Sequence, residues 1–495
     1  MIASIIAYLI FCYIILSSNF FSENSIHKYA MPFFFTLKIL AGIVLYFIYN
    51  HFYENRATGD VNKYFDDAIQ IYKSLDGNVK DYFKILFNIN CNEQYMQKYF
   101  EKIDHWEVFG NSNFINDART VIRFNLLLLP ISKGYYYFHS IIINFISFAG
   151  LTFIYNVFCN ISAHKKFTNA LVCFLMPSIL FWCSGVLKES LLVFFLGLAI
   201  HSIHKIFFQH IVHYFKYILI LLLGLFGILI TKFYVLFALL PAIIFLVIQK
   251  QSRLKLSQIA LIIYASATAF LLIDSLATQK IITPLAQKQK EFVNVARGGY
   301  YFEQIKGALV DTIYINHSDS NYLIKRFKKV YTIKKGCPAF VYRKLEFEKS
   351  FEMPNNNKNV RLLSHLIPAN SYIYLPTLNS TFFSLLKTIP VALFNSIFLP
   401  TFFNLQNAMY ILPALENFIL MLLLITCLLK QRKIDDSSKL FLWFCSIFCF
   451  NLLVIIGITT PVLGALVRYK VPALPFIFYL VLSFINFDFL KKNMK

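Results

Sequence analysis

Four residues with chemical potential follow the second apolar segment of the chain. Asp60, Tyr64, Asp66 and Asp67 lie in RATGDVNKYFDDAIQIYKSL, residues 56–75. A carboxylate near the membrane exit can act as a general base toward an acceptor hydroxyl, or it can hold a divalent metal. The same pattern is typical of an interfacial helix with a cap and a solvated acidic face. We predict Asp60 as the first catalytic candidate and Asp66 or Asp67 as the next. Tyr64 is predicted to have a supporting role in the same site.

A second group of candidates is cationic and lies in or beside apolar segments. Its members are Lys188, Lys232, Arg468 and Lys470. A charge in hydrocarbon costs at least ~2.5 kcal/mol on insertion scales, so each of these side chains needs a partner. Arg binds phosphate bidentately and Lys binds it as a point charge. We predict a site for an anionic headgroup, with snorkelling lysines in tight turns as the alternative.

One of these cations adjoins an acid within a long apolar stretch. Residues 168–207 as a single helix would be about 60 Å long, twice the thickness of the hydrocarbon core. We therefore expect a break at Ser184-Gly185. Glu189 then falls in the first turn of the next helix, where its charge suits the helix dipole. Lys188 does not suit that end, so we expect Glu189 to orient it toward an anion.

A third candidate site lies in a basic polar stretch, in KQKEFVNVARGGYYFEQ, residues 288–304. Arg297 and Tyr300 flank two glycines there. An aromatic face suits a sugar ring and an Arg suits a phosphate, so the pair is a candidate lid or sugar-site lining. An ordinary loop turn explains the same residues.

The elements that must position these side chains are apolar. The chain has 495 residues, of which 58% are hydrophobic and only 15% charged. Eleven segments are long enough to span about 30 Å of hydrocarbon. They lie near 2–18, 31–50, 137–158, 168–183, 189–207, 214–230, 233–249, 258–277, 414–429, 440–458 and 464–487. We predict an all-α polytopic membrane protein with about 11 transmembrane helices, within a range of roughly 10 to 13.

Two polar stretches interrupt these segments and define the expected domain order. Residues 1–50 form the first two spans, 51–136 a large loop with interfacial helices, 137–277 a transmembrane bundle, 278–413 a second large loop and 414–495 the last spans. Within the second loop, 381–403 is apolar and contains Pro390 and Pro400, which predicts an interfacial or re-entrant segment. The first segment has no basic n-region and no small-residue cleavage site, so we expect a retained helix.

The loop charges predict the orientation of the chain. Six short connections (19–30, 161–167, 205–216, 250–257, 430–439 and 489–495) hold 15 Lys/Arg, and the opposite set holds four. The positive-inside rule then places the N-terminus outside and the C-terminus in the cytoplasm. Both large loops become extracytoplasmic, and they hold most of the acids.

The net charge of +22 is consistent with anionic lipid headgroups and phosphates as partners. We find no nucleic-acid module, and nucleic acid is not expected as a partner. The chain also lacks a P-loop, a G-x-S-x-G, an H-E-x-x-H and a G-x-G-x-x-G motif. No metal ligand set or cofactor is assigned, and a divalent metal remains open.

The stretch GDVNKYFDDA resembles the first exoplasmic loop of GT-C-type glycosyltransferases, which carries their acidic catalytic residue. PSILFWCSGVLKES, FNSIFLPTFFNLQNAMYILPALEN and VRYKVPALPF are similar to membrane proteins of bacterial polysaccharide gene clusters and to polymerases of the Wzy and EpsG type. The resemblance implies a GT-C-like fold and a polyprenyl-(di)phosphate-linked sugar donor, used outside the bacterial cytoplasmic membrane. Where such proteins often carry Arg-Pro-Tyr, this chain has Lys232-Phe233-Tyr234.

The expected function is transfer of a sugar or oligosaccharide from an undecaprenyl-linked donor to a glycan or lipid-linked acceptor in cell-surface polysaccharide synthesis, as a single transfer or a polymerisation. The alternatives are a lipid-linked glycan flippase or other transporter, because intramembrane charges also mark transport paths, and a non-catalytic envelope assembly protein.

Overall fold

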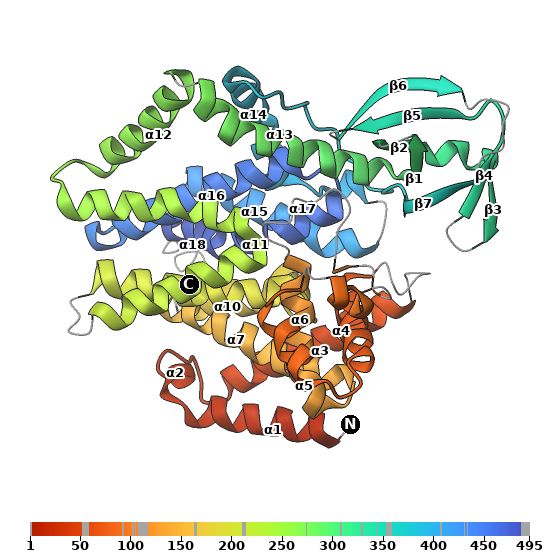
Figure 1. Ribbon diagram of the computed structural model, residues 1–495. Coiled ribbons are helices and arrows are strands. Elements are labelled where there is room, and N and C mark those ends of the chain that lie inside the picture. Colours follow the sequence, from red (N-terminus) through yellow and green to blue (C-terminus); the bar gives the residue numbers. More distant parts are fainter. Residues whose placement is uncertain are drawn as a thin grey trace. The chain divides into compact units, whose positions relative to one another are not determined.

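The chain folds into two units (Figure 1). The first comprises the described residues of Met1–Ile263, Ile411–Leu452 and Arg468–Lys495, and the second those of Tyr264–Tyr410 and Leu453–Val467. This computed structural model describes residues 2–51, 59–91, 94–100, 103, 105–106, 117–162, 166–209, 214–273, 275–306, 309–327, 330–343, 345–352, 359–405, 408–429, 431–432 and 434–486.

The first unit is helical. Its elements are α1 (Ile2–Ser17), α2 (Asn19–Ser22), α3 (Ala30–His51), α4 (Asp60–Ser74), α5 (Val79–Phe87), η2 (Gln94–Tyr99), α6 (Asp117–Ser132), α7 (Tyr136–Ile161), α8 (Lys166–Ala170), η4 (Leu171–Leu175), α9 (Pro177–Trp182), α10 (Lys188–Phe208), α11 (Tyr214–Gln251), α15 (Ile411–Leu429) and α18 (Leu474–Phe484). Three further helices run from one unit into the other: α12 (Leu256–Ile273), α16 (Asp436–Thr459) and α17 (Leu463–Tyr469).

Seven helices in the described residues are long and apolar enough to cross a membrane: α3, α7, α10, α11, α12, α15 and α16 without its first two residues. The bent pair α17 and α18, with 68° between them, would make an eighth span. The protein is therefore a multi-pass membrane protein with a helical bundle, as the composition predicted. The predicted count of eleven transmembrane helices stays a prediction. The helix α1 is shorter than these seven, and two of the predicted spans, 214–230 and 233–249, lie in one element, α11.

Glycines bring α7 and α10 into close contact at the centre of the bundle. A Cβ atom added to Gly197 would lie 2.3 Å from the carbonyl oxygen of Gly150, and one added to Gly150 would lie 2.4 Å from Cα of Phe194. Small residues allow such an approach between helices in lipid, where packing drives association. This contact fixes α10, which carries Lys188 and Glu189 at its first turn.

Two interruptions in the apolar helices occur at the predicted positions. The turn Cys183–Leu187 separates α9 from α10. In α11, Lys232 has φ −151° and ψ 84°, so two helical parts meet there at a kink. Both interruptions therefore place charged residues at helix ends rather than in the middle of helices.

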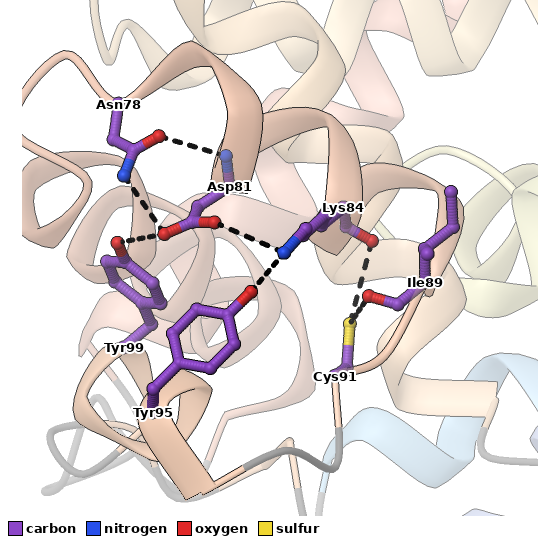
Figure 2. A network of polar contacts seen from close by, with 7 residues as sticks. All are labelled: Asn78, Asp81, Lys84, Ile89, Cys91, Tyr95 and Tyr99. Atoms are coloured by element: carbon purple, nitrogen blue, oxygen red, sulfur yellow. Dashed lines mark hydrogen bonds and ion pairs between the residues drawn. The ribbon is translucent and has the colours of Figure 1, made fainter.

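Part of the first polar stretch is held together by a network around Asp81 (Figure 2). Asn78 caps α5, donating from its Nδ2 to the Asp81 carboxylate at 3.0 Å and accepting from the Asp81 N–H at 3.0 Å. Tyr99 donates to the same carboxylate at 2.7 Å, and Lys84 lies 3.9 Å from it and bonds Tyr95. These contacts join α5 to η2, so Asp81 has a structural explanation.

The second unit contains a seven-stranded antiparallel sheet with strand order β3-β4-β7-β1-β2-β5-β6. The strands are β1 (Gly299–Lys306), β2 (Leu309–Ile315), β3 (Leu323–Phe327), β4 (Val330–Ile333), β5 (Pro338–Arg343), β6 (Glu346–Glu352) and β7 (Asn359–Leu366), with η5 (His317–Tyr322) between β2 and β3. Sequence analysis missed this sheet. The expectation of an all-helical chain therefore needs correction outside the apolar segments.

The core of the sheet explains why this basic stretch folds. Phe302, Ile313, Ile315 and Ile333 are buried together with Cys337. Neighbouring residues of a strand point to opposite faces of the sheet, and both faces bury side chains here, because Tyr301 and Tyr314 are buried as well and pack on each other at 5.1 Å between ring centres.

The helical part of the second unit is built from α13 (Ser275–Arg297), α14 (Phe382–Phe398), η6 (Phe402–Asn404) and η7 (Ala408–Tyr410). Ile282 and Ala286 of α13 pack with Ala392 of α14 and Ile458 of α16. The opposite side of α14 exposes Phe383 and other large apolar residues. Residues 381–403 thus contain one amphipathic helix, and whether it spans or lies at the interface stays a prediction.

Candidate functional site

The turn before α10 is fixed by polar contacts from two other helices. The Lys38 ammonium of α3 donates to the Cys183 carbonyl and, at 3.3 Å, to Ser184 Oγ. Asn144 Nδ2 of α7 donates to the Ser184 carbonyl at 2.8 Å. Gly42 of α3 packs against the same carbonyl, since an added Cβ would lie 2.2 Å from it. The backbone groups freed by the helix break are therefore satisfied, and the start of α10 is held in place.

Glu189 is the centre of a buried charge cluster. Arg468 binds its carboxylate through two nitrogen atoms: Nε lies 2.7 Å from Oε1, and Nη2 lies 2.7 Å from Oε2. Lys232 Nζ lies 3.5 Å from Oε1. The Glu189 side chain is only 1% exposed. Two cations from α11 and α17 thus converge on one carboxylate at the first turn of α10, where the helix dipole also favours a negative charge.

Lys188 forms the rim of this cluster. Its Nζ lies 2.7 Å from Oδ1 of Asp117, the first residue of α6. The Lys188 side chain is 10% exposed and that of Asp117 is 33% exposed. Thr120 Oγ1 donates to the Ile230 carbonyl at 2.8 Å, which holds α6 against α11 next to the Lys232 kink. The Lys188–Asp117 pair is therefore the accessible edge of a cluster that is otherwise buried.

Aromatic rings line the cations. Lys188 Nζ lies 5.0 Å from the centre of the Tyr64 ring, and Lys232 Nζ lies 4.1 Å from the Tyr469 ring. The Arg468 guanidinium lies 5.6 Å from the Trp182 ring. Ring faces attract cations without neutralising them, so these contacts stabilise the cations while leaving their charge available.

The expected role of Glu189 toward Lys188 needs correction. Glu189 pairs with Arg468 and Lys232, whereas Lys188 pairs with Asp117. The reason is helical geometry, because neighbouring residues on a helix point about 100° apart. Lys188 and Glu189 therefore face different neighbours although they adjoin in sequence.

Lys470 lies in a second buried cluster rather than beside Glu189. Its Nζ donates to Asn417 Oδ1 at 2.6 Å, and the neighbouring Glu416 of α15 attracts its charge. The Glu416 carboxylate accepts hydrogen bonds from Ser178 N–H, at 2.8 Å, and from Ser178 Oγ. The structure thus brings together three of the four predicted cations and separates the fourth.

The predicted acids lie on α4, and the structure describes them unequally. Asp60 is the first residue of α4, and its side chain lies outside the described residues. Asp66 is half-buried. Asp67 is buried and accepts hydrogen bonds from His105. Tyr64 of the same helix reaches Lys188, so α4 borders the Glu189 cluster.

Arg297 and Tyr300 belong to the second unit and are described by themselves. Arg297 is the exposed last residue of α13. Tyr300 of β1 stacks on His365 with 4.1 Å between ring centres, and its ring is also parallel to His317 at 5.9 Å. Partial burial, with His317 nearby, lowers the pKa of His365. The three rings form a small aromatic surface on this sheet.

No group of three or more His, Cys, Asp or Glu side chains in the described part of the chain is arranged to hold a metal ion. The described site combines three cations held beside aromatic rings with one buried and one partly exposed carboxylate. Lys and Arg side chains of this kind can bind a phosphate.

Four polar residues of this region were not predicted from the sequence. Asp117 and Glu416 belong to the two clusters, Lys38 holds the turn before α10, and His105 pairs with Asp67. A signal existed for Lys38 and Glu416, since each is a charged residue inside an apolar segment. Asp117 and His105 lie in a polar stretch where charges are common, so only the fold reveals their partners.

Comparison with family models, curated proteins and solved structures returned no match. The site therefore rests on its own geometry.

Proposed function

We propose that the chain is an integral membrane glycosyltransferase. It transfers a sugar or oligosaccharide from a polyprenyl-(di)phosphate donor to a glycan or lipid-linked acceptor in cell-surface polysaccharide synthesis. The observation that supports this most is the convergence of Lys232 and Arg468 on Glu189, with Lys188 and its partly exposed partner Asp117 at the edge of the cluster.

The charges of this cluster favour an anionic ligand. Three cations face two carboxylates, Glu189 and Asp117, so the named residues carry a surplus positive charge. Charged side chains in membrane segments are costly, and their retention marks a functional site by default. A lipid phosphate would neutralise the surplus and would reach the cluster from the membrane, where its chain is dissolved.

The accessible edge suggests how the phosphate enters. The Asp117 carboxylate binds the Lys188 ammonium, with Oδ1 2.7 Å from Nζ. A carboxylate oxygen accepts hydrogen bonds from a cation much as a phosphate oxygen does. An incoming phosphate replaces this carboxylate on Lys188. Glu189 stays in place because its carboxylate is buried and gripped by Arg468.

The same arrangement suits glycosyl transfer. As the bond between the sugar and the phosphate breaks, negative charge grows on the phosphate. Prearranged cations stabilise that charge more in the transition state than in the ground state, which lowers the barrier. Asp60 remains the sequence-based candidate for the base or a metal ligand. Arg297 and Tyr300 remain candidates for covering the donor or lining the sugar site.

The proposal includes a location and an orientation. The chain would lie in the bacterial cytoplasmic membrane with the N-terminus outside, the C-terminus in the cytoplasm and the large polar stretches outside, as the loop charges favour. A cysteine introduced at Ser320 in η5 should react with an impermeant thiol reagent added to intact cells. Protection of that position would overturn the orientation.

A direct test uses a readout that does not depend on the sugar. Purified protein is mixed with lipid-linked saccharides extracted from source cells that lack this protein, and released polyprenyl (di)phosphate is measured by mass spectrometry. Wild-type protein should release it in the presence of acceptor. Asp60→Asn should abolish release if Asp60 is the base or a ligand, and unchanged release would remove Asp60 from the site.

A lipid-linked glycan flippase is the second candidate. The Glu416–Lys470 cluster favours it, because a buried acid and base inside apolar helices also occur along transport paths. A flippase moves the lipid across a vesicle membrane without cleaving it. Transfer of intact donor with no released polyprenyl phosphate would support the flippase and contradict the transferase. Binding without either activity would favour an assembly role.

A further inference from the structure

We propose that His105, oriented by Asp67, is the general base that deprotonates the acceptor hydroxyl. This inference rests on the proposed transferase function and assigns a catalytic residue within it. It also changes the roles of two predicted acids. Asp67 becomes a positioning residue rather than the base itself, and His105 takes the place of Asp60 as the base, which leaves Asp60 as the candidate metal ligand.

Asp67 holds His105 through two hydrogen bonds. The Asp67 Oδ2 atom accepts from the backbone N–H of His105 at 3.2 Å and lies 3.0 Å from ring Nδ1. A carboxylate can only accept, so Nδ1 carries a hydrogen, and in the neutral imidazole Nε2 then carries the lone pair. The imidazole is thereby fixed in the tautomer that can accept a proton at Nε2, the same logic by which a carboxylate orients a catalytic histidine elsewhere.

Trp106, the residue after His105, is held by contacts with α6 and with Phe100. Arg119 Nε of α6 donates to the carbonyl of the next residue, Trp106, at 2.8 Å. The Trp106 ring stacks on Phe100 at 4.3 Å and faces the Arg119 guanidinium at 5.0 Å. The His105 side chain is nevertheless 23% exposed. A held backbone with an accessible ring is the arrangement that a general base requires.

Tyr64 connects this pair to the phosphate site. Its ring meets the His105 ring edge-on at 6.4 Å between centres, and the Lys188 ammonium lies 5.0 Å from the same ring. Tyr64 and Asp67 are three residues apart on α4 and therefore share one face. The proposed base and the accessible phosphate-binding lysine thus contact one aromatic side chain.

The proposed step is balanced. His105 Nε2 takes the proton of the acceptor hydroxyl, and the oxygen attacks the anomeric carbon of the donor sugar. The bond from that carbon to the phosphate oxygen breaks, and its electron pair leaves with the polyprenyl (di)phosphate. The growing charge is held by Lys188, Lys232 and Arg468. The imidazolium, stabilised by Asp67, then returns its proton to water.

A purely structural role predicts different results. In that case the Asp67–His105 pair only ties α4 to the segment at Trp106, and its loss would disturb lipid binding and stability together. A catalytic role predicts loss of turnover while the phosphate site still binds lipid. The two roles are separated by measuring binding and turnover on the same variants.

The experiment uses the variants His105→Ala, His105→Gln and Asp67→Asn. The control is His27→Ala, which changes an exposed histidine distant in sequence from His105. Release of polyprenyl (di)phosphate from the lipid-linked saccharide extract gives turnover, and undecaprenyl phosphate in nanodiscs gives binding. His105→Ala should lose roughly 10²- to 10⁴-fold in kcat with unchanged lipid binding, and added imidazole should restore part of it. Asp67→Asn should lower kcat with little change in KM.

Three results would overturn the inference. If His105→Ala has near-normal turnover and the wild type is active, His105 is not the base, and the transferase function still stands. Joint loss of turnover and of undecaprenyl phosphate binding in both His105 variants, with no imidazole rescue, would assign a structural role. A wild type that binds lipid but releases no polyprenyl phosphate would instead overturn the transferase function, and the base with it.

Discussion

Two buried charge clusters lie within the first unit, and they differ in balance and access. The Glu189 cluster consists of Glu189, Arg468, Lys232, Lys188 and Asp117. The Glu416 cluster consists of Glu416, Lys470, Asn417 and Ser178. The first has more cations than acids and reaches solvent at Asp117. The second pairs one acid with one base, and all four of its residues are buried.

The difference indicates two uses of buried charge. A balanced and closed cluster satisfies its own charges and braces the helices that carry it, here α9, α15 and the bend between α17 and α18. A cluster whose described residues hold more cations than acids, and which has an accessible edge, can take up an anionic ligand. Burial alone would have grouped Lys470 with the other three cations, as the sequence analysis did, whereas the contacts separate them.

Breaking the Glu416 cluster from one side should have the largest effect on stability. Lys470→Met removes the hydrogen bond to Asn417 Oδ1 and the charge that attracts the buried Glu416 side chain, and the loss of such a charged hydrogen bond costs about 1.5–3 kcal/mol. We expect little folded protein and a lower thermal midpoint, measured by fluorescence-detected size exclusion and thermal unfolding.

The matched control is the double variant Glu416→Leu/Lys470→Met. Replacing a buried pair by apolar residues is often neutral or stabilising, so stability and turnover should both recover. A double variant that is stable but inactive would show that the Glu416 cluster has a direct function, and would weaken the contrast between the two clusters.

The equivalent change in the Glu189 cluster should separate stability from function. Glu189→Leu/Lys232→Met/Arg468→Met removes the buried carboxylate together with both cations that contact it, so we expect a folded protein with a thermal midpoint within a few degrees of wild type. Turnover should nevertheless fall by at least about a hundredfold, since the loss of one preorganised charge contact costs about 2.7–4 kcal/mol in the transition state. Retained turnover would contradict the assignment of this cluster.

A smaller effect should follow from moving the turn that positions both Lys188 and Glu189. In Gly42→Ala, the added Cβ atom would lie 2.2 Å from the Ser184 carbonyl, so the turn must shift. Overpacking of this kind costs about 1–3 kcal/mol in stability. Turnover should also fall, because the shifted turn displaces Lys188 and Glu189. Ile43→Ala, at an exposed position on the same helix, is the control. Equal effects of the two variants would show that the turn tolerates displacement.

The helix breaks and the position of Glu189 could be predicted from the sequence, because they depend on segment lengths and on nearby residues. Hydrocarbon thickness restricts helix length, so the break at Ser184-Gly185 and the interruption at Lys232 followed from segment lengths and charge positions. The presence of Glu189 in a first helical turn followed in the same way. These features depend on residues close together in the chain.

The remainder depends on distant contacts. Arg468 reaches Glu189 across 279 residues, and Glu416 meets Ser178 across 238. No spacing rule links such positions. The sheet was missed for another reason, because its strands are short and carry many charged residues, so they read as polar loop. His105 gave no signal, since an isolated histidine in a polar stretch has no periodic pattern.

Binding of undecaprenyl phosphate to Lys188→Gln tests the central claim most directly. Lys188 lies at the edge of the cluster beside the partly exposed Asp117, and Gln keeps a hydrogen-bond donor at this position, so the variant should fold like wild type. The loss of a charged hydrogen bond to the phosphate should weaken lipid binding roughly tenfold or more. Native mass spectrometry in nanodiscs measures this, with Glu416→Leu/Lys470→Met as the reference that should bind normally. Unchanged affinity in Lys188→Gln would contradict the account.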